Sequence, residues 1–326
     1  FNFPAWNMAE KMACALLAGM PVLEKPGTAT ALVAWRIAQI LVESKLLPAG
    51  AYQLLVGSAR DLVDHLGPQD VVAFTGSAAT GRKLRGHASV VRHNLHLNVE
   101  TDIVQKTGQK CTAVRRILVP KERVEEVAAD LVARLQKVQV GDPKSPETRM
   151  GPLASAQQLA DVRAGMTELL KHAKALTGGP GAVHPKGYFV APTLLLASDA
   201  RASVFHELEV FGPCATILPY SGSADEAIEL VNKGGGGLVA SLYSNDKPWS
   251  DAVTLGIAPW HGRVWVGCDR TAGQALAPGM VLPAALHGGP GRAGGGAELG
   301  GLRGLEPYFQ RTAVQGFQGF LEKLGT

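Results

Sequence analysis

The stretch "MPVLEKPGTATALVAWRIAQILVESKLLPAGAYQLLVG", residues 20–57, contains two short apolar runs separated by a longer segment with helical spacing. The first run is closed by Pro26 and the second by Gly57. The helical segment places an apolar set toward one side, consisting of Leu32, Trp35, Ile37, Ile40 and Leu41. Strand, helix and strand in this order are typical of a parallel sheet that is covered by helices.

The same alternation continues along the chain. We expect strands at 70–76, 95–100, 115–120, 238–244 and 262–267, and helices at 59–67, 121–138 and 225–234. The helix at 121–138 is amphipathic, with Val124, Val127, Leu131 and Leu135 on one face. The sequence therefore predicts an α/β fold in which a second α/β unit begins near residue 101.

Composition narrows the class of protein. The chain has 326 residues, 46% hydrophobic and 18% charged, which is typical of a globular protein and not of a disordered one. Lysine and arginine are scattered, so neither a nucleic-acid partner nor a membrane is expected, and no apolar run is long enough for a membrane span. The four cysteines show no metal-ligand spacing, so we expect no metal and a reducing, cytoplasmic setting.

One cysteine has an unusual setting. Cys14 lies in an apolar pattern, whereas Cys111 lies in the polar turn "TGQKCTAVRR", residues 107–116. Exposed backbone N–H groups and nearby cations stabilise a thiolate, which is the nucleophilic form of cysteine. Cys111 is therefore a candidate nucleophile, with a merely tolerated loop cysteine as the alternative.

Two turns are candidates for binding a dinucleotide. "FTGSAATG", residues 74–81, carries Gly76 and Ser77 between a strand and a helix, where backbone N–H groups suit a pyrophosphate. Lys25 follows another strand at the same predicted sheet edge. The alternatives are a turn that binds nothing and a surface lysine before a turn-forming proline.

Three further residues and one segment are candidates for a site. Glu100 ends an apolar strand and is a candidate general base, and the Asn2 amide is a candidate oxyanion donor, although such an asparagine is more often a turn cap. Glu209 precedes the apolar turn "VFGP". The glycine-rich segment 287–304 has the composition of a linker, but we favour an ordered loop that lines a site.

The order of these motifs along the chain is similar to that of a known protein family. "FNFP", "EKP", "FTGS", a strand-end glutamate, "GQKC", "EVFGP" and "GGPGRAGGGAELGG" follow one another in a single chain. In this the chain resembles the aldehyde dehydrogenase superfamily, most of all its branch acting on CoA-linked semialdehydes in aerobic degradation of aromatic rings. The resemblance implies an α/β, aldehyde dehydrogenase-like fold: a Rossmann-like cofactor domain at 1–100, an α/β catalytic domain at 101–305, and a C-terminal strand at 306–326 that serves a homodimer.

The resemblance also implies a reaction. Cys111 attacks the aldehyde carbonyl to give a thiohemiacetal, whose oxyanion is held by Asn2 and the backbone N–H of Cys111. Oxidation leaves a thioester, and Glu100 activates the water that hydrolyses it to the carboxylic acid. An acylating enzyme that releases acyl-CoA is an alternative, but the presence of Glu100 favours hydrolysis. A non-catalytic protein of the same fold, with a binding or assembly role, is the alternative from another class.

For the cofactor, the resemblance assigns Glu209 to the nicotinamide ribose, with Phe211 beside the ring. Lys25 would contact the adenosine ribose, and Gly76 and Ser77 the pyrophosphate. NAD-preferring relatives carry an acidic residue shortly after Lys-Pro, where this chain has Gly27-Thr28. Without that carboxylate a 2′-phosphate meets no like charge and can use Lys25. We therefore expect NADP in preference to NAD.

The chain departs from the family pattern in two places. Relatives carry a long segment before "FNFP", whereas this sequence begins at Phe1 without methionine, so we expect residues to precede it. Relatives also carry a helix and a strand between base and nucleophile, whereas Glu100 and Cys111 are 11 positions apart. An extended segment of that length reaches about 33 Å, so the two side chains can still meet.

Overall fold

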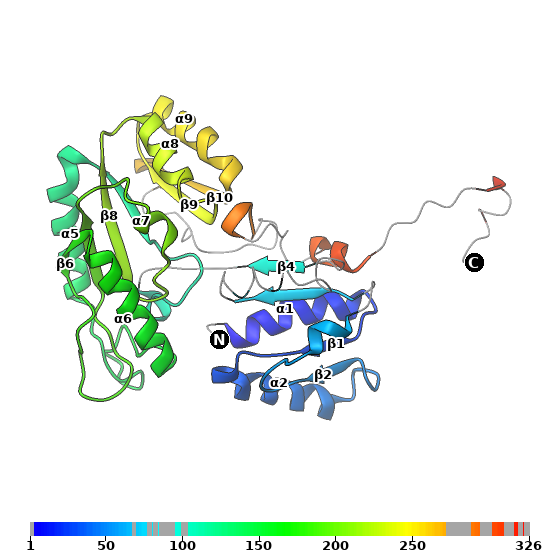
Figure 1. Ribbon diagram of the computed structural model, residues 1–326. Helices are drawn as coiled ribbons and strands as arrows, with labels where there is room; N and C mark the ends of the chain where they lie inside the picture. The colour runs from blue at the N-terminus through cyan, green and yellow to red at the C-terminus, as the bar shows by residue number, and fades with distance from the viewer. Residues whose placement is uncertain are drawn as a thin grey trace.

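The computed structural model describes residues 3–66, 70–76, 80, 84, 95–98, 104–271, 288–293, 302–309, 316–318 and 322. Its helices and strands form an N-terminal unit, which holds α1 to β4, and a second unit that begins at β5 (Figure 1). The N-terminal unit contains α1 (Pro4–Leu17), β1 (Val22–Glu24), α2 (Ala31–Ser44), β2 (Tyr52–Leu54), β3 (Val72–Thr75) and β4 (Leu95–Asn98). Short 3-10 helices lie at Thr28–Thr30 and Leu62–His65, the latter within the helix expected at 59–67.

The N-terminal unit is built from two parallel strand pairs. β1 pairs with β2, and β3 pairs with β4, each in parallel register. Both pairs lie at positions where the sequence predicts strands, and α2 is the helix that connects the first pair, as expected. The unit is therefore the βαβ arrangement that the alternation of residues 20–57 indicates.

The face of α2 that is buried differs from the apolar side. The buried residues of α2 are Ala31, Ala34 and Ala38. Leu32 is 74% exposed, and Trp35 and Ile40 are each 51% exposed. Ile37 and Leu41 of the predicted set are half-buried, so the packed face of α2 is formed mainly by its alanines, which let the helix approach its neighbours closely.

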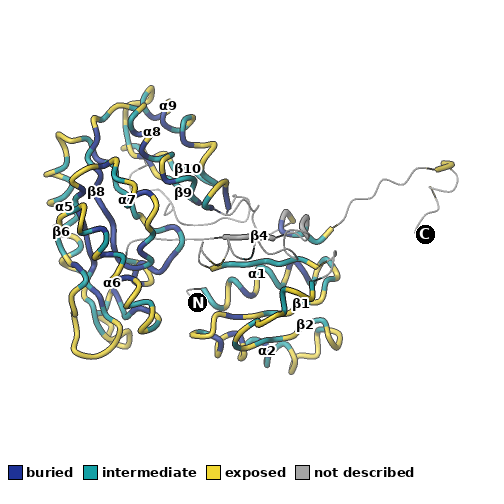
Figure 2. The backbone as a smooth tube through the Cα atoms, viewed as in Figure 1, coloured by how far each residue is buried: buried dark blue, intermediate teal, exposed yellow. Residues whose placement is uncertain are grey.

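The second unit is centred on a four-stranded sheet. Its strand order is β5-β8-β7-β6, with bounds β5 (Arg116–Pro120), β6 (Ala173–Thr177), β7 (Thr193–Ala197) and β8 (Cys214–Tyr220). β5, β8 and β7 are parallel, and β6 is antiparallel at the edge. Figure 2 shows β8 as a buried central strand, and its apolar sequence is what a strand covered on both faces requires.

Two helices cover the two faces of this sheet. The helices are α5 (Val124–Gln136) and α6 (Ala156–Leu170). Leu194 and Ile217 pack in the cluster that α5 covers, whereas their neighbours Leu195 and Leu218 pack in the cluster that holds α6. The predicted face of α5 (Val124, Val127, Leu131 and Leu135) lies against the first cluster, which confirms the amphipathic reading.

The remaining elements extend the same core. They are α7 (Val204–Glu207), α8 (Ala224–Asn232), β9 (Gly237–Tyr243), α9 (Lys247–Ile257) and β10 (His261–Gly267), with β9 and β10 in a parallel pair. Side-chain caps fix the starts of three helices. Ser155 accepts from the N–H of Gln158 at the start of α6, Ser223 from Glu226 at α8, and Asp246 from Trp249 at α9.

The fold class is confirmed, whereas the domain boundaries stay a prediction. The strands and helices expected at 115–138, 225–234, 238–244 and 262–267 all lie where predicted. The sequence predicts a C-terminal strand at 306–326. Its first residues instead belong to a 3-10 helix, Leu302–Tyr308, and most of the remaining segment lies outside the described residues. No helix in the described part of the chain has the length and apolar character that crossing a membrane requires.

Candidate active site

The loop before Cys111 has a strained backbone. Lys106, Thr107 and Gly108 follow one another with φ of 55°, 58° and 66°. A left-handed conformation costs a residue with a side chain roughly 1–2 kcal/mol, so neighbouring contacts must hold this loop in place. Residues with such unusual backbone angles cluster at functional sites, where the surrounding structure holds the chain in one conformation.

Side chains of the loop supply those contacts. The Thr107 hydroxyl donates to the carbonyl oxygens of Gly151 (3.1 Å) and Pro152 (3.4 Å). The Gln109 amide oxygen accepts from the N–H of Ala154 at 3.1 Å. Thr107 and Gln109 are only 4% and 5% exposed. The polar turn that carries Cys111 is therefore anchored to the segment before α6, and its polar side chains face inward.

The Cys111 loop and the "VFGP" turn are in direct contact. A side chain at Gly108 would collide with the main-chain carbonyl of Gly212. Arg115 bridges the two segments, because its guanidinium donates to the carbonyl oxygens of Gly212 (2.8 Å) and Gly108 (3.2 Å). Two motifs about a hundred positions apart in the sequence thus meet around one arginine.

Glu209 and Phe211 belong to the same cluster. An oxygen of the Glu209 carboxylate lies 4.0 Å from a guanidinium nitrogen of Arg115. The Arg115 guanidinium carbon lies 5.5 Å from the centroid of the Phe211 ring, a cation–π distance. The structure therefore brings two predicted cofactor residues, Glu209 and Phe211, beside the loop of the predicted nucleophile.

The N-terminal motif also reaches this loop. Asn2 lies outside the described residues, but its neighbour Phe3 is described. The Lys106 ammonium lies 3.0 Å from the centroid of the Phe3 ring. "FNFP" and "GQKC" are thus neighbours in space, while the position of the Asn2 amide stays a prediction.

The four cysteines differ in burial. Cys14 and Cys214 are buried, whereas Cys111 and Cys268 have intermediate exposure. Burial raises the pKa of the Cys214 thiol to about 12, against a smaller lowering by Arg115. Burial also raises the pKa of Cys14. The two buried thiols are therefore poor nucleophiles, and Cys111 is the accessible thiol that lies within the cluster of predicted site residues.

The predicted dinucleotide residues lie in the N-terminal unit. Lys25 directly follows β1, is exposed, and donates to the carbonyl of Pro26 at 2.9 Å. Thr28 is exposed and begins a 3-10 helix. Gly76 directly follows β3, and the Phe74 ring fills the space that a side chain there would need. Ser77 and Glu100 lie outside the described residues, so their roles stay predictions.

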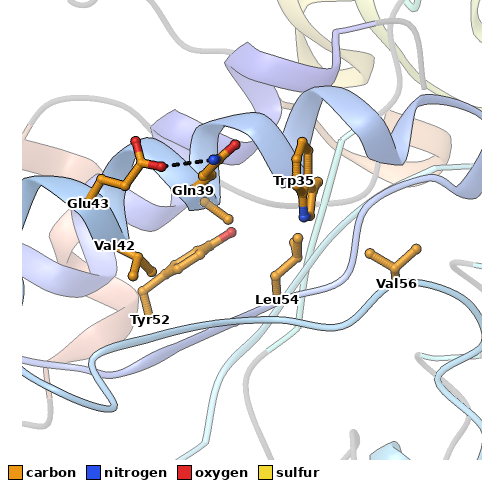
Figure 3. Close-up of a pocket in the computed structure, with 8 residues that line it drawn as sticks. Trp35, Gln39, Val42, Glu43, Tyr52, Leu54 and Val56 are labelled. Atoms are coloured by element: carbon orange, nitrogen blue, oxygen red, sulfur yellow. Dashed lines mark hydrogen bonds between the residues drawn. The ribbon is translucent and has the colours of Figure 1, made fainter.

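A separate groove lies between α2 and the chain around β2. It has a volume of about 540 Å³ and is lined by Trp35, Ala38, Gln39, Val42, Glu43, Tyr52, Leu54 and Val56. Figure 3 shows Tyr52, Leu54 and Val56 on one side, facing α2. Gln39 donates to Glu43 at 2.8 Å, and burial raises the pKa of Tyr52 to about 12. The groove is lined by no cysteine, so Cys111 remains the candidate reactive thiol.

Within the described ranges, no three residues among histidine, cysteine, aspartate and glutamate converge on a point that suits a metal ion.

Sequence reasoning missed what the two arginines after Cys111 do. It treated Arg115 and Arg116 as cations near the thiol, but Arg115 bonds the carbonyls of Gly108 and Gly212 and Arg116 bonds His206. The available signal was the pair itself, because two adjacent arginines entering a buried strand require fixed partners.

Comparisons with known proteins agree with this geometry. The aldehyde dehydrogenase family matches residues 1–104 and 97–314. The chain is 39% identical to 3,4-dehydroadipyl-CoA semialdehyde dehydrogenase of Aromatoleum evansii, over 89% of this chain and 63% of that protein. It is 38% identical to Protein MaoC of Klebsiella aerogenes, over 54% of this chain and 53% of that protein.

Solved structures show the same fold. Lactaldehyde dehydrogenase from Escherichia coli has a TM-score of 0.82 at 26% identity, covering 96% of this chain and 68% of that one. A cysteine-to-alanine mutant of aldehyde dehydrogenase C from Pseudomonas syringae, complexed with NAD+ and octanal, has a TM-score of 0.79 at 27% identity, covering 94% and 66%. The chain spans just under two thirds of the length of the Aromatoleum relative. By family match, sequence identity and fold, the chain belongs to the aldehyde dehydrogenase family.

Proposed function

We propose that this chain catalyses NADP-dependent oxidation of an aldehyde to the carboxylic acid, with Cys111 as nucleophile. The observation that supports this most is the cluster around Arg115, where the Cys111 loop meets Glu209 and Phe211. The proposed substrate is an acyl-CoA semialdehyde from aromatic-ring degradation, because the relative from Aromatoleum evansii is named for such a substrate.

The proposed chemistry is carried by the chain's own side chains. The Cys111 thiolate attacks the carbonyl carbon, and the resulting oxyanion accepts hydrogen bonds from the Asn2 amide and the backbone N–H of Cys111. After oxidation, Glu100 removes a proton from a water molecule that attacks the thioester carbon. The acid then leaves, and the Cys111 thiolate is regenerated.

The residues present fit a nicotinamide dinucleotide. Gly76 directly follows β3, at the strand end where a pyrophosphate would meet backbone N–H groups, and Lys25 supplies an exposed cation after β1. Glu209 would hold the nicotinamide ribose with Phe211 beside the ring, and Ser77 would join Gly76 at the pyrophosphate. When bound, the nicotinamide supplies a hydride acceptor.

The preference for NADP is proposed from Thr28. This position carries no carboxylate, and it lies on an exposed 3-10 turn close to Lys25. A 2′-phosphate there would meet a cation and no like charge. We also propose a cytoplasmic homodimer, in which segment 306–326 adds to the shared sheet.

The test measures NADPH formation by the full chain with a CoA-linked semialdehyde, with NADP+ and NAD+ compared at equal concentrations. Cys111→Ser should abolish turnover and leave coenzyme binding unchanged. Glu100→Gln should accumulate an acyl-enzyme, seen as a mass increase on the peptide that contains Cys111. Release of the free acid supports hydrolysis, and release of an acyl-CoA supports the acylating alternative. Coenzyme binding without turnover of any aldehyde would support the non-catalytic reading.

A further inference from the structure

His206 is held at three of its atoms. Its Nε2 donates to the carbonyl of Ala200 at 2.8 Å, which assigns the ring proton to Nε2 and leaves Nδ1 as an acceptor. Nδ1 then accepts from the Arg116 guanidinium at 2.8 Å. The main-chain oxygen of His206 accepts from Arg292 at 2.7 Å. His206 is 3% exposed, so these contacts are shielded from water.

Arg116 joins this histidine to the end of a helix. Its guanidinium also donates to the carbonyls of Leu230 (2.8 Å) and Val231 (3.1 Å), in the last turn of α8. Helix C-terminal carbonyls carry a partial negative charge and satisfy a buried cation. A side chain at Gly234 would collide with the Arg116 guanidinium in the position where these hydrogen bonds hold it. Burial, followed by the charge of Arg292, lowers the pKa of Arg116 to about 10.

Arg115 and Arg116 hold the two ends of one segment. Arg116 bonds His206 at its start, and Arg115 bonds the carbonyl of Gly212 at its end. Between them lie Glu209 and Phe211, the two predicted coenzyme residues. Because Arg115 and Arg116 are consecutive where β5 begins, the strand that leaves the Cys111 loop holds the segment 206–212 at both ends.

The glycine-rich segment is attached at the same place. The N–H of Arg292 donates to the carbonyl of Gly235 at 3.0 Å, while its guanidinium holds His206. A side chain at Gly236 would crowd the carbonyl of Pro290. The segment 288–293 is therefore packed on the chain just after α8, and it shares His206 with Arg116.

We propose that Arg116 and His206 are positioning residues that set Glu209 against the Cys111 loop. The proposal rests on the proposed function, in which Glu209 binds the nicotinamide ribose. In this role Arg116 acts through the segment 206–212, because its guanidinium is taken up by His206 and by the carbonyls of Leu230 and Val231. Removing it should therefore weaken coenzyme binding only as far as Glu209 contributes to that binding.

A double-mutant cycle on the full chain tests this. The variants are Arg116→Met, Glu209→Gln and the double variant, and the readout is the Kd of NADPH from its fluorescence on binding. We expect Arg116→Met to weaken binding about 10- to 100-fold alone, and less than about twofold in the Glu209→Gln background. Equal losses in both backgrounds would mean a general effect on the fold and would overturn the proposal.

Two further sets of variants serve as controls for the double-mutant cycle. Arg201→Met, which removes an exposed arginine paired with Glu226 and Glu229, is the matched control and should leave Kd unchanged. Where Arg116→Met does not fold, His206→Phe replaces it in the cycle. His206→Asn should keep the NADPH binding that His206→Phe loses, because its amide oxygen can accept from Arg116. Failure of Asn to restore binding would overturn the proposal. Absence of NADPH binding by the unmodified chain would instead overturn the proposed function.

Discussion

Gly108 packs directly against the main-chain carbonyl of Gly212, with no room for a side chain between the two residues. This contact brings the loop of the candidate nucleophile onto the turn that follows Glu209. Arg115 closes the contact by donating to the carbonyl oxygens of both glycines. Gly108, Gly212 and Arg115 thus set the distance between Cys111 and Glu209, the proposed ribose-binding residue.

Gly108→Ala should therefore destabilise the chain and disturb the site. The left-handed φ of 66° and the collision with Gly212 together should cost about 2–4 kcal/mol of unfolding free energy. Urea unfolding measures the cost. Gly181→Ala is the matched control, because a side chain there meets nothing within 4 Å. Equal stability of the two variants would contradict the packing described for Gly108.

Selective alkylation should separate Cys111 from the buried thiols. With a pKa of about 12, Cys214 is a thiolate in only about one molecule in 10⁴ at pH 8. Iodoacetamide should thus modify Cys111 rapidly and leave Cys214 unmodified in the folded chain, as peptide mass spectrometry would show. Cys111→Ser should remove the fast phase, whereas Cys268→Ser should leave it. A fast phase that persists in Cys111→Ser would exclude Cys111 as the reactive thiol.

The sequence predicted β1 to β5, β9 and β10, which lie in apolar runs bounded by glycine, proline or polar residues, but it did not predict β6, β7 and β8 of the central sheet. It predicted the orientation of α2 poorly. Large apolar residues such as Leu32 and Trp35 are exposed, and the packed face is made of Ala31, Ala34 and Ala38. A periodic pattern reports which residues share a face, but tertiary contacts decide which face is packed.

The candidate site was likewise predicted only in part. The approach of "GQKC" to "EVFGP" was expected from family resemblance, and the structure brings the two motifs together. The Arg116–His206 contact was not expected, because nothing in the residues at 116 and 206 indicates that they meet across 90 positions. Pairings between distant segments depend on sheet order, here β5 beside β8, which local patterns do not encode.

Stability should fall on acidification because of His206. The pKa of His206 is lowered, mainly because the ring is buried. A hydrogen bond to Ala200 and the charge of Glu207 raise this pKa, whereas the charges of Arg116 and Lys233 lower it further. The unfolded chain thus binds a proton more readily than the folded chain. The stabilisation is present above pH about 6.5 and is lost as the pH falls through the folded-state pKa.

The expected slope is up to about 1.4 kcal/mol per pH unit for each such proton, and His261, whose pKa burial also lowers, should contribute similarly. Urea unfolding between pH 7 and pH 5 measures it. His206→Asn should reduce the slope, because asparagine does not titrate but keeps an acceptor for Arg116. His172→Asn, at an exposed position, is the control. A slope equal in His206→Asn and the unmodified chain would show that His206 does not titrate differently on folding.

Thr28→Glu should shift coenzyme preference from NADP toward NAD. The new carboxylate would lie on the exposed 3-10 turn near Lys25, where it repels a 2′-phosphate and can accept hydrogen bonds from a ribose with both hydroxyls free. The KM for NADP should rise about 10- to 100-fold relative to that for NAD. Ala29→Glu puts the same charge one position later on an exposed residue and should change the ratio much less. A clear NAD preference in the unmodified chain would remove the basis for assigning Thr28 this role, because the missing carboxylate would then not decide the choice of coenzyme.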